Sequence, residues 1–469
     1  MTAKRIGLIV GAMALLASIV LPLPAGIDRG GLVTAGLVAL MAAWWMTEAL
    51  PLTATALMPF LVLPMAGVLN AKETAGAYYS PILFLILGGA FLALAIERTG
   101  MHRRLALWLL RFSGRGSGQF GVLVAFMAAA AILSMLISNT STALIMVPMA
   151  LAVLEAGGSP ADEKDGLAGA LPMGIAFAAT IGGLGTLVGT PTNAIAVGLI
   201  DRLTGVRIGF AEWAMYGLPL VILGVPLAAI IIGRVQRVAD HPFDVAAARL
   251  AIDTHDAWTA PEKRLLPIIA ITFALWMAQP LLVPLLPEGA LTDGTIAVAA
   301  GLSLFLLPDG TGRPLLTWPE ADRAPWGVIM MFGGGLALAA GMSASGLADW
   351  LGQILLPLGA LPLVALALLV TAMVILITEF ASNVAAASAI VPVVASLSVA
   401  LNVDPMLLAM PAAIAATWGF MLPAGTGPNA IAWSSGRLRI DRMVKAGLVL
   451  DLVGAVVIVA LVWGVRLLL

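Results

Sequence analysis

Two polar triplets interrupt apolar stretches of this sequence and are related by a fixed shift. Ser-Asn-Thr at 138–140 returns 244 residues later as Ser-Asn-Val at 382–384. Each triplet precedes a Gly-Thr segment, GTPTNAIA from Gly189 and, 236 residues further on, GTGPNAIA from Gly425. Hydroxyl, amide and carbonyl oxygens bind hard cations, whereas N–H groups, amides and hydroxyls bind anions. Paired polar interruptions in two apolar halves indicate a transporter's binding site.

The stretches around these motifs are nearly free of charge. Residues 119–154, 167–200 and 405–436 contain no charged side chain, and 361–403 contains only Glu379. Helix ends leave backbone carbonyls and N–H groups unpaired, and Pro and Gly within a span leave more of them unpaired. A dianion that meets no Lys or Arg there would be costly to desolvate, and a bound cation offsets that cost. The motifs therefore predict cation-coupled anion transport.

Composition predicts an all-α polytopic membrane protein. Hydrophobic residues make up 61% of the chain, charged residues 10%, and mean hydropathy is +1.06. The apolar runs are continuous and long enough to span a bilayer as helices, whereas a strand-built barrel would show short alternating segments. A net charge of −1 gives no sign of a nucleic-acid partner, and the absence of Cys excludes disulfides and thiol chemistry. We interpret the apolar N-terminus as an uncleaved first helix.

Charge placement predicts inverted repeats. Five arginines follow the apolar run that ends near residue 97, whereas the matching stretch 342–360 has no Lys or Arg; they are Arg98, Arg103, Arg104, Arg111 and Arg115. The segment after GTGPN is likewise basic, and the one after GTPTN is balanced. By the positive-inside rule, corresponding parts of the two copies lie on opposite sides of the membrane. Such repeats converge near its middle.

We expect eleven crossings and two helical hairpins in the cell inner (plasma) membrane, with the N-terminus cytoplasmic and the C-terminus external. The crossings are expected at 6–21, 31–49, 52–69, 81–97, 167–200, 213–233, 264–286, 294–308, 325–341, 405–436 and 444–468. The stretches 119–154 and 361–403 could each be one kinked helix, but both exceed one bilayer thickness, which favours hairpins that turn at the triplets. The first hairpin would enter from the cytoplasm and the second from outside.

These expectations divide the chain into five parts. Residues 1–70 and 264–308 would be scaffold helices, and 234–263 a cytoplasmic linker. The first inverted repeat would span 71–233 and the second 309–469, each with its hairpin.

Several motifs, in matching order, resemble the divalent anion/sodium symporter family. They are WWMTEALPLTATALMP from Trp44, SNTSTALIMVP from Ser138, TEFASNVAAASAIVP from Thr378, and the segments GTPTNAI and GTGPNAI. The resemblance covers essentially the whole chain. It implies a sodium-coupled transporter of dicarboxylates, citrate or sulfate, with two or more Na⁺ sites and no organic cofactor. It also implies a homodimer in which a transport domain slides past a scaffold domain, an elevator mechanism.

The same resemblance implies site residues. The Na⁺ ligands would come from Ser134, Ser138, Asn139 and Gly189 at one site and from Thr378, Ala381, Asn383 and Gly425 at the other. The substrate would meet Asn139, Thr140, Thr190, Asn383, Val384, Thr426 and Pro428. Val384 stands where the first copy has Thr140, which removes a hydroxyl at nearly constant volume and bears on selectivity.

Other functions fit less well. An intramembrane enzyme would need a nucleophile with a base, a carboxylate pair or a metal cluster, and a primary pump would need a nucleotide motif; the sequence shows neither. The main alternative is a Na⁺-independent dicarboxylate exchanger on the same fold. Glu379 could either couple transport to H⁺ or hold the second hairpin in place.

Overall fold

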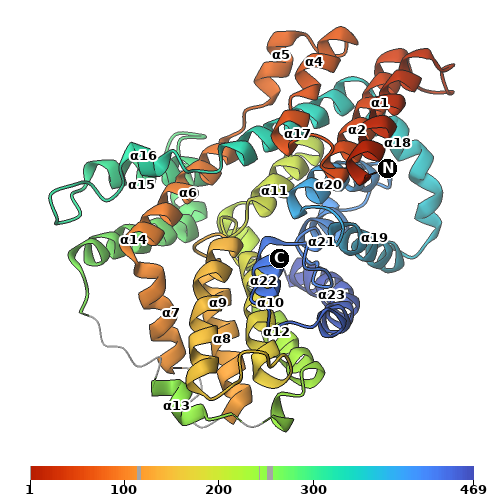
Figure 1. The fold of residues 1–469 in the computed structure, drawn as a ribbon. Helices are drawn as coiled ribbons and strands as arrows, with labels where there is room; N and C mark the ends of the chain where they lie inside the picture. The colour runs from red at the N-terminus through yellow and green to blue at the C-terminus, as the bar shows by residue number, and fades with distance from the viewer. Residues whose placement is uncertain (1, 113–117, 242, 251–256, 469) are drawn as a thin grey trace.

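The computed structural model describes residues 2–112, 118–241, 243–250 and 257–468, and this part of the chain is helical (Figure 1). Arg115 and residues 251–256 of the expected linker lie outside it. The helices are α1 Ala3–Val20, α2 Arg29–Thr47, α3 Leu52–Thr55, α4 Met58–Met65, α5 Ala71–Ala77, α6 Pro81–Thr99, α7 Met101–Phe112, α8 Gly118–Ser134, α9 Asn139–Ala156, α10 Gly166–Gly183, α11 Pro191–Thr204, α12 Phe210–Val235, η1 Val238–Asp240, α13 Val245–Leu250, α14 Ala260–Leu282, η2 Val283–Leu285, α15 Asp293–Leu306, α16 Trp318–Ala321, α17 Trp326–Ala344, α18 Leu347–Leu355, η3 Leu356–Ala360, α19 Leu363–Thr378, α20 Asn383–Ala400, η4 Pro405–Leu407, α21 Ala409–Ala415, α22 Gly427–Ser434 and α23 Ile440–Leu468. The all-α class is confirmed.

Ten helices in the described residues are long and apolar enough to cross a membrane, or eleven if the pair Leu347–Ala360 and Leu363–Thr378, bent by 119°, is one span. One expected crossing is wrong in detail. Residues 52–69 form the short helices α3 and α4 instead of one span. Pro51 stands before α3, and Pro59 and Pro64 lie within α4. Each proline removes a backbone donor, which favours short helices over a continuous one.

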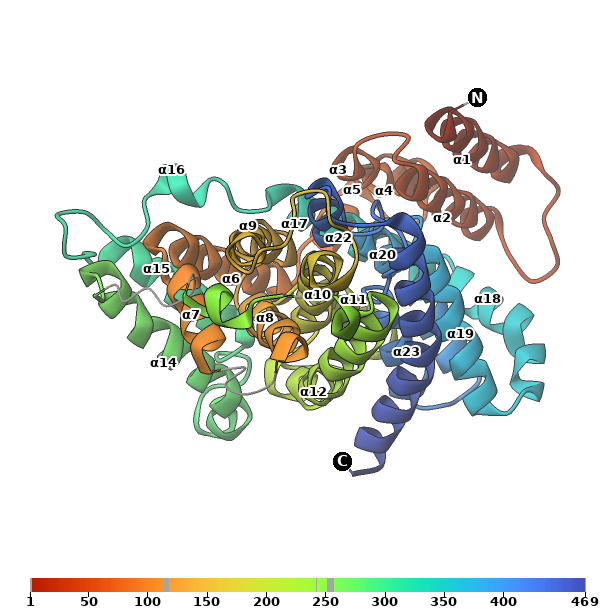
Figure 2. The ribbon, with the colours of Figure 1, turned by 60° about the horizontal axis from the view of Figure 1, so that its bottom comes forward.

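Both triplet stretches form two helices, not one kinked helix. The arms α8 and α9 are separated by residues 135–138, and α19 and α20 by residues 379–382. The two arms of each pair contact one another, and α8 and α9 stand side by side in both ribbon views (Figures 1 and 2). We call residues 135–138 and 379–382 the first and second hairpin tips.

The Gly-Thr segments break two further helices. α10 ends at Gly183 and α11 begins at Pro191, so residues 184–190 form a first break. α21 ends at Ala415 and α22 begins at Gly427, so residues 416–426 form a second, longer break. The expected spans 167–200 and 405–436 are thus broken helices. Pro and Gly are the residues that favour such interruptions.

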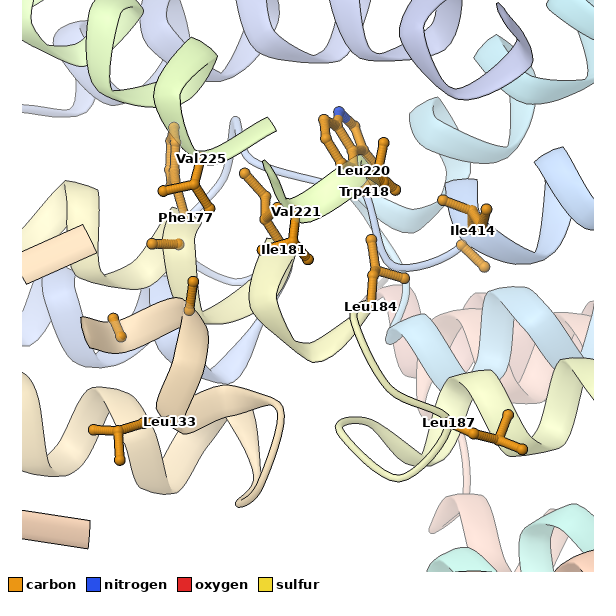
Figure 3. Packing of buried hydrophobic residues seen from close by; sticks show 14 of the residues in the cluster. Leu133, Phe177, Ile181, Leu184, Leu187, Leu220, Val221, Val225, Ile414 and Trp418 are labelled. Atoms are coloured by element: carbon orange, nitrogen blue, oxygen red, sulfur yellow. The ribbon is translucent and has the colours of Figure 1, made fainter. Parts of the chain in front are cut away.

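The two repeats interlock around α10. All 18 residues of α10 are buried, and the helix contacts α8, α9, α12 and α22. Figure 3 shows part of this core, where Phe177 and Ile181 of α10 lie near Val221 and Val225 of α12 and near Trp418 of the second break. The second arm of each hairpin also packs on the opposite repeat, α9 on α22 and α20 on α11. Both tips and both breaks therefore belong to one packed body.

The contact between α8 and α10 gives a stability prediction. A methyl group on Gly182 would overlap the backbone carbonyl of Ala131, whereas one on Gly464 in α23 would meet nothing within 4 Å. Gly182→Ala should lower stability by about 1–3 kcal/mol through overpacking. Gly464→Ala should be neutral or stabilise by up to about 1 kcal/mol. Thermal unfolding in detergent compares the two, and equal melting temperatures would contradict this packing.

Candidate functional site

The serine of each triplet is a helix N-cap. The Ser138 Oγ accepts a hydrogen bond from the backbone N–H of Ser141 at 3.1 Å, at the start of α9. The Ser382 Oγ accepts one from the N–H of Ala385 at 3.2 Å, at the start of α20. An N-cap satisfies a backbone donor that the helix itself leaves free. These serines therefore fix where the second arm of each hairpin begins.

The asparagine of each triplet links the two arms of its hairpin. The Ser134 hydroxyl donates to Asn139 Oδ1 at 2.7 Å, and the Thr378 hydroxyl donates to Asn383 Oδ1 at 3.0 Å. In both cases the hydroxyl precedes the asparagine by five residues, and it is fully buried. The two repeats thus build the same polar contact across each tip.

Oxygen atoms converge beside the first tip. A methyl group on Gly189 would lie 2.5 Å from the carbonyl oxygen of Gly183 and 3.0 Å from that of Ser134. A methyl group on Gly183 would in turn overlap Asn139 Oδ1. The first tip and the first break therefore meet so closely that only glycine fits. We call residues 134–140 and 183–193 the first half-site; its uncharged oxygens suit a hard cation.

A similar set lies beside the second tip. The Thr378 hydroxyl is also 2.7 Å from the carbonyl oxygen of Ala416. A methyl group on Gly425 would lie 3.3 Å from the carbonyl oxygen of Glu379. Ala381 is buried at the tip, and its N–H donates to the carbonyl of Ile377. Residues 378–384 and 416–429 form what we call the second half-site.

Glu379 holds the second break in place. Its Oε1 accepts the N–H of Met421 at 2.8 Å, and its Oε2 accepts the N–H of Leu422 at 2.9 Å. The side chain is 1% exposed. Both carboxylate oxygens are thus engaged with the break, which supports the holding role among the two roles that the sequence left open for this residue.

Two asparagines that the sequence analysis did not select satisfy the breaks. Asn193 Nδ2 donates to the carbonyl oxygens of Gly183 at 2.8 Å and Thr186 at 2.9 Å. Asn429 Nδ2 donates to the carbonyl of Leu422 at 3.1 Å. Both are fully buried and occupy the same place in GTPTN and GTGPN, so the repeat itself could have identified them. Their amides satisfy carbonyls that a broken helix leaves free.

The two half-sites meet at Thr140 and Gly427. A methyl group on Gly427 would lie 2.5 Å from the Thr140 Oγ1, and both residues are exposed. Thr140 lies in the first turn of α9 and Gly427 in the first turn of α22. Two helix N-termini, the ends that favour negative charge, therefore lie together at an open position.

The other residues that we expected to contact the substrate differ in where they lie relative to this position. Thr426 is the N-cap of α22, where its Oγ1 accepts the N–H of Asn429 at 3.2 Å, and Pro428 is buried in the first turn. Val384 is half-buried and packs on two apolar clusters, one formed by both repeats and one formed mostly by the N-terminal helices α2 to α4. Thr190 lines the cavity described next, together with Ser138 of the first tip. The structure thus brings the two half-sites together through Thr140 and Gly427, and neither of these residues lines the cavity that contains Thr190.

A cavity of about 280 Å³ reaches the first tip from the α6 side. Ser138, Gly189 and Thr190 line it together with residues of α6, and Glu97 and Arg323 lie on its wall. Three of the expected site residues are therefore accessible from this cavity. The described residues contain no group of three or more His, Cys, Asp or Glu that could hold a metal ion.

Comparison with known proteins identifies the family. Residues 2–469 match the family described as "Sodium:sulfate symporter transmembrane region". The chain belongs to this family. This finding confirms the resemblance noted from the motifs, and the family is one of transporters rather than enzymes.

The chain is similar to two bacterial transporters of known name and has the fold of a third. It is 38% identical to the sodium-dependent dicarboxylate transporter SdcS of Staphylococcus saprophyticus over 98% of this chain and 91% of the relative. It is 35% identical to SdcS of Staphylococcus aureus over the same shares. The YdaH transporter of Alcanivorax borkumensis has a similar fold, with a TM-score of 0.59 at 16% identity over 92% of this chain and 98% of that one.

The two asparagines at the breaks predict losses of stability that differ in size. Asn193→Leu removes the donor to two buried carbonyls, whereas Asn429→Leu removes the donor to one. Each unpaired buried carbonyl costs about 1–3 kcal/mol. Asn193→Leu should therefore lower the melting temperature in detergent more than Asn429→Leu. The reverse order would contradict the assignment of these hydrogen bonds.

Proposed function

We propose that the protein is a secondary active transporter that couples Na⁺ entry to symport of a divalent anion, a C4-dicarboxylate such as succinate or malate. The observation that carries this proposal is the meeting of two oxygen-rich half-sites at Thr140 and Gly427, with no charged side chain in the tips and breaks except Glu379. Relatives that are named sodium-dependent dicarboxylate transporters support the choice of ion and substrate. Citrate and sulfate are the other anions that the chemistry admits.

Na⁺ would bind at both half-sites. The first would use Ser134, Ser138, Asn139 and Gly189, and the second Thr378, Ala381, Asn383 and Gly425. Two contacts support these sets, the Ser134–Asn139 and Thr378–Asn383 hydrogen bonds, because each places two side-chain oxygens within 3.0 Å of one another. A cation that enters there would replace the hydroxyl hydrogen as the partner of the amide oxygen.

The anion would bind where the half-sites meet. Asn139 and Asn383, the Thr140 and Thr426 hydroxyls and the free N–H groups at the starts of α9 and α22 can each donate to a carboxylate. None of these donors carries a full positive charge. A dianion therefore needs the nearby cations to offset its desolvation, which couples the two binding events physically. Pro428 would shape the pocket beside Thr426, and Val384 would add an apolar wall.

Transport would follow an elevator mechanism in a homodimer. The hairpins and broken helices of the repeats 71–233 and 309–469 would move as one body past scaffold helices within 1–70 and 264–308. The interlocking of α9 with α22 and of α20 with α11 supports a single moving body. The N-terminus would be cytoplasmic and the C-terminus external, with the first hairpin entering from the cytoplasm and the second from outside.

The test is uptake of radiolabelled succinate into proteoliposomes, with an inward Na⁺ gradient or with choline, and with or without unlabelled succinate inside. Symport predicts uptake into empty vesicles that requires Na⁺. Uptake that ignores Na⁺ but requires internal dicarboxylate would overturn the proposal in favour of an exchanger.

Removal of either triplet asparagine should abolish uptake. Asn139→Ala and Asn383→Ala each delete an amide proposed to contact both cation and substrate, so we expect at least a tenfold loss. Asn70→Ala, at the N-cap of the exposed helix α5, is the matched control and should retain uptake. Size-exclusion profiles check that all three variants stay folded. Near-normal uptake by either triplet variant would exclude the proposed site.

Val384→Thr should change substrate preference more than Na⁺ dependence. The substitution restores the hydroxyl that the first repeat carries at Thr140, at nearly constant volume. We expect the ranking of succinate, malate, citrate and sulfate as competitors to shift by severalfold, about the effect of one hydrogen bond. An altered Na⁺ response with an unchanged ranking would contradict placement of Val384 on the substrate side.

A further inference from the structure

The cavity beside the first tip has one charged side chain of each sign on its wall. Glu97 and Arg323 line it together with the hydroxyl-bearing residues Ser138, Ser141 and Thr190. Within the described ranges, neither charged side chain forms an ion pair or a hydrogen bond with another residue. Both charges are therefore free to act on whatever occupies the cavity.

The two charges lie at the end of the cavity away from the first break. At the other end, a methyl group on Gly89 of α6 would lie 3.1 Å from the side chain of Val188 in that break. Glu97 follows Gly89 by eight residues, which is about 12 Å along a helix. Arg323 comes two residues after α16, which contacts α6, and its side chain is exposed. The cavity thus extends along α6 from the first break to an exposed arginine.

Ion pairs fix the segment that carries Arg323. Arg98, at the end of α6, forms an ion pair with Asp309, whose side chain is fully buried. Arg313 forms one with Glu320 at 2.5 Å. The backbone N–H of Arg323 donates to the carbonyl of Glu320 at 3.3 Å. The backbone of Arg323 is therefore held in place, while its guanidinium keeps all its donors for a ligand.

An anion that arrives at this end of the cavity meets Arg323 first. Arg323 is exposed, whereas Glu97 is half-buried on α6. A guanidinium can donate two parallel N–H bonds to one carboxylate or sulfate group. The cavity volume of about 280 Å³ is just under the ~300 Å³ at which pockets for small molecules begin, so the ligand would be small.

We propose that Arg323 binds a divalent anion at the outer end of this cavity, as a site separate from the position where Thr140 meets Gly427. The choice of a divalent anion rests on the proposed function. Binding at Arg323 would need no Na⁺, because the guanidinium supplies the positive charge that the two half-sites lack. A charge at the opening of a narrow cavity also raises the local concentration of the opposite ion, so Arg323 would concentrate the anion beside the first tip.

A thiol on the cavity wall tests this site without measuring transport. The chain has no Cys, and Ala93 is a half-buried residue of the wall, so Ala93→Cys gives one reporter thiol. The rate of its modification by a negatively charged methanethiosulfonate is measured on the full-length protein in detergent, without Na⁺. Succinate and sulfate should each slow the reaction, compared with choline chloride at equal ionic strength.

Substitutions of the two charged residues, each made in the Ala93→Cys protein, assign the effect. Arg323→Gln should abolish the protection by succinate and lower the rate with the anionic reagent about threefold, the effect of one nearby charge. Arg323→Lys keeps the charge and should restore that rate, with weaker protection because the two parallel N–H bonds are lost. Glu97→Gln is the matched control in the same cavity and should keep the protection.

The possible outcomes separate this inference from the proposed function. Protection that persists in Arg323→Gln, or that is absent from the parent Ala93→Cys protein, would overturn the anion site. Protection lost in Glu97→Gln but kept in Arg323→Gln would overturn it as well. Size-exclusion profiles check that each variant is folded. Failure of Na⁺-driven uptake would contradict the proposed function alone, since protection is measured without Na⁺ and without transport.

Discussion

The structure depends on how the backbone groups are paired where a membrane-buried helix is interrupted. Each interruption frees backbone carbonyls and N–H groups, and the bilayer offers no water to pair with them. In the described residues, two tips and two breaks interrupt helices in this way and pack against one another. Buried side chains pair some of the freed groups: Asn193 and Asn429 hold carbonyls, and Glu379 holds N–H groups. The oxygens and helix N-termini that remain are the groups proposed to bind ions and substrate.

The two halves of the site are similar but not equivalent. At the position of Glu379 in the second tip, the first tip has Met135. There the side chain comes from the break instead of the tip, because the Thr186 hydroxyl of the first break donates to the Met135 carbonyl at 2.8 Å. The first half-site is thus held by the hydroxyl of Thr186 and the second by the buried carboxyl group of Glu379.

Sequence patterns predicted the parts that follow from chain length and local chemistry. Continuous apolar runs indicated helices, two runs were too long for one bilayer crossing, and repeated Gly-Thr-Pro patterns marked the breaks, all of which the structure has. The span at 52–69 was predicted wrongly because its hydropathy favours a continuous helix, whereas Pro59 and Pro64 remove backbone donors within it. The Na⁺ ligand set that the family resemblance implied stays a prediction; within it, Ser134 and Asn139 are hydrogen-bonded to one another.

Contacts between distant segments could not be predicted from the sequence. The partners of Glu379 lie 42 and 43 residues away, and Thr186 reaches a carbonyl 51 residues before it. Asp451 was also missed, although a carboxyl group in the apolar part of a long helix is itself a signal.

The central claim is that cation and dianion bind where Thr140 meets Gly427. The chain has no Cys, so Thr140→Cys gives a single reactive thiol at an exposed position. The direct measurement is the rate at which a small thiol reagent modifies this residue in proteoliposomes, without ligand, with Na⁺, and with Na⁺ plus succinate. The account predicts that Na⁺ and succinate together slow the reaction more than Na⁺ does. A rate that succinate leaves unchanged, in a variant that still takes up succinate, would contradict it.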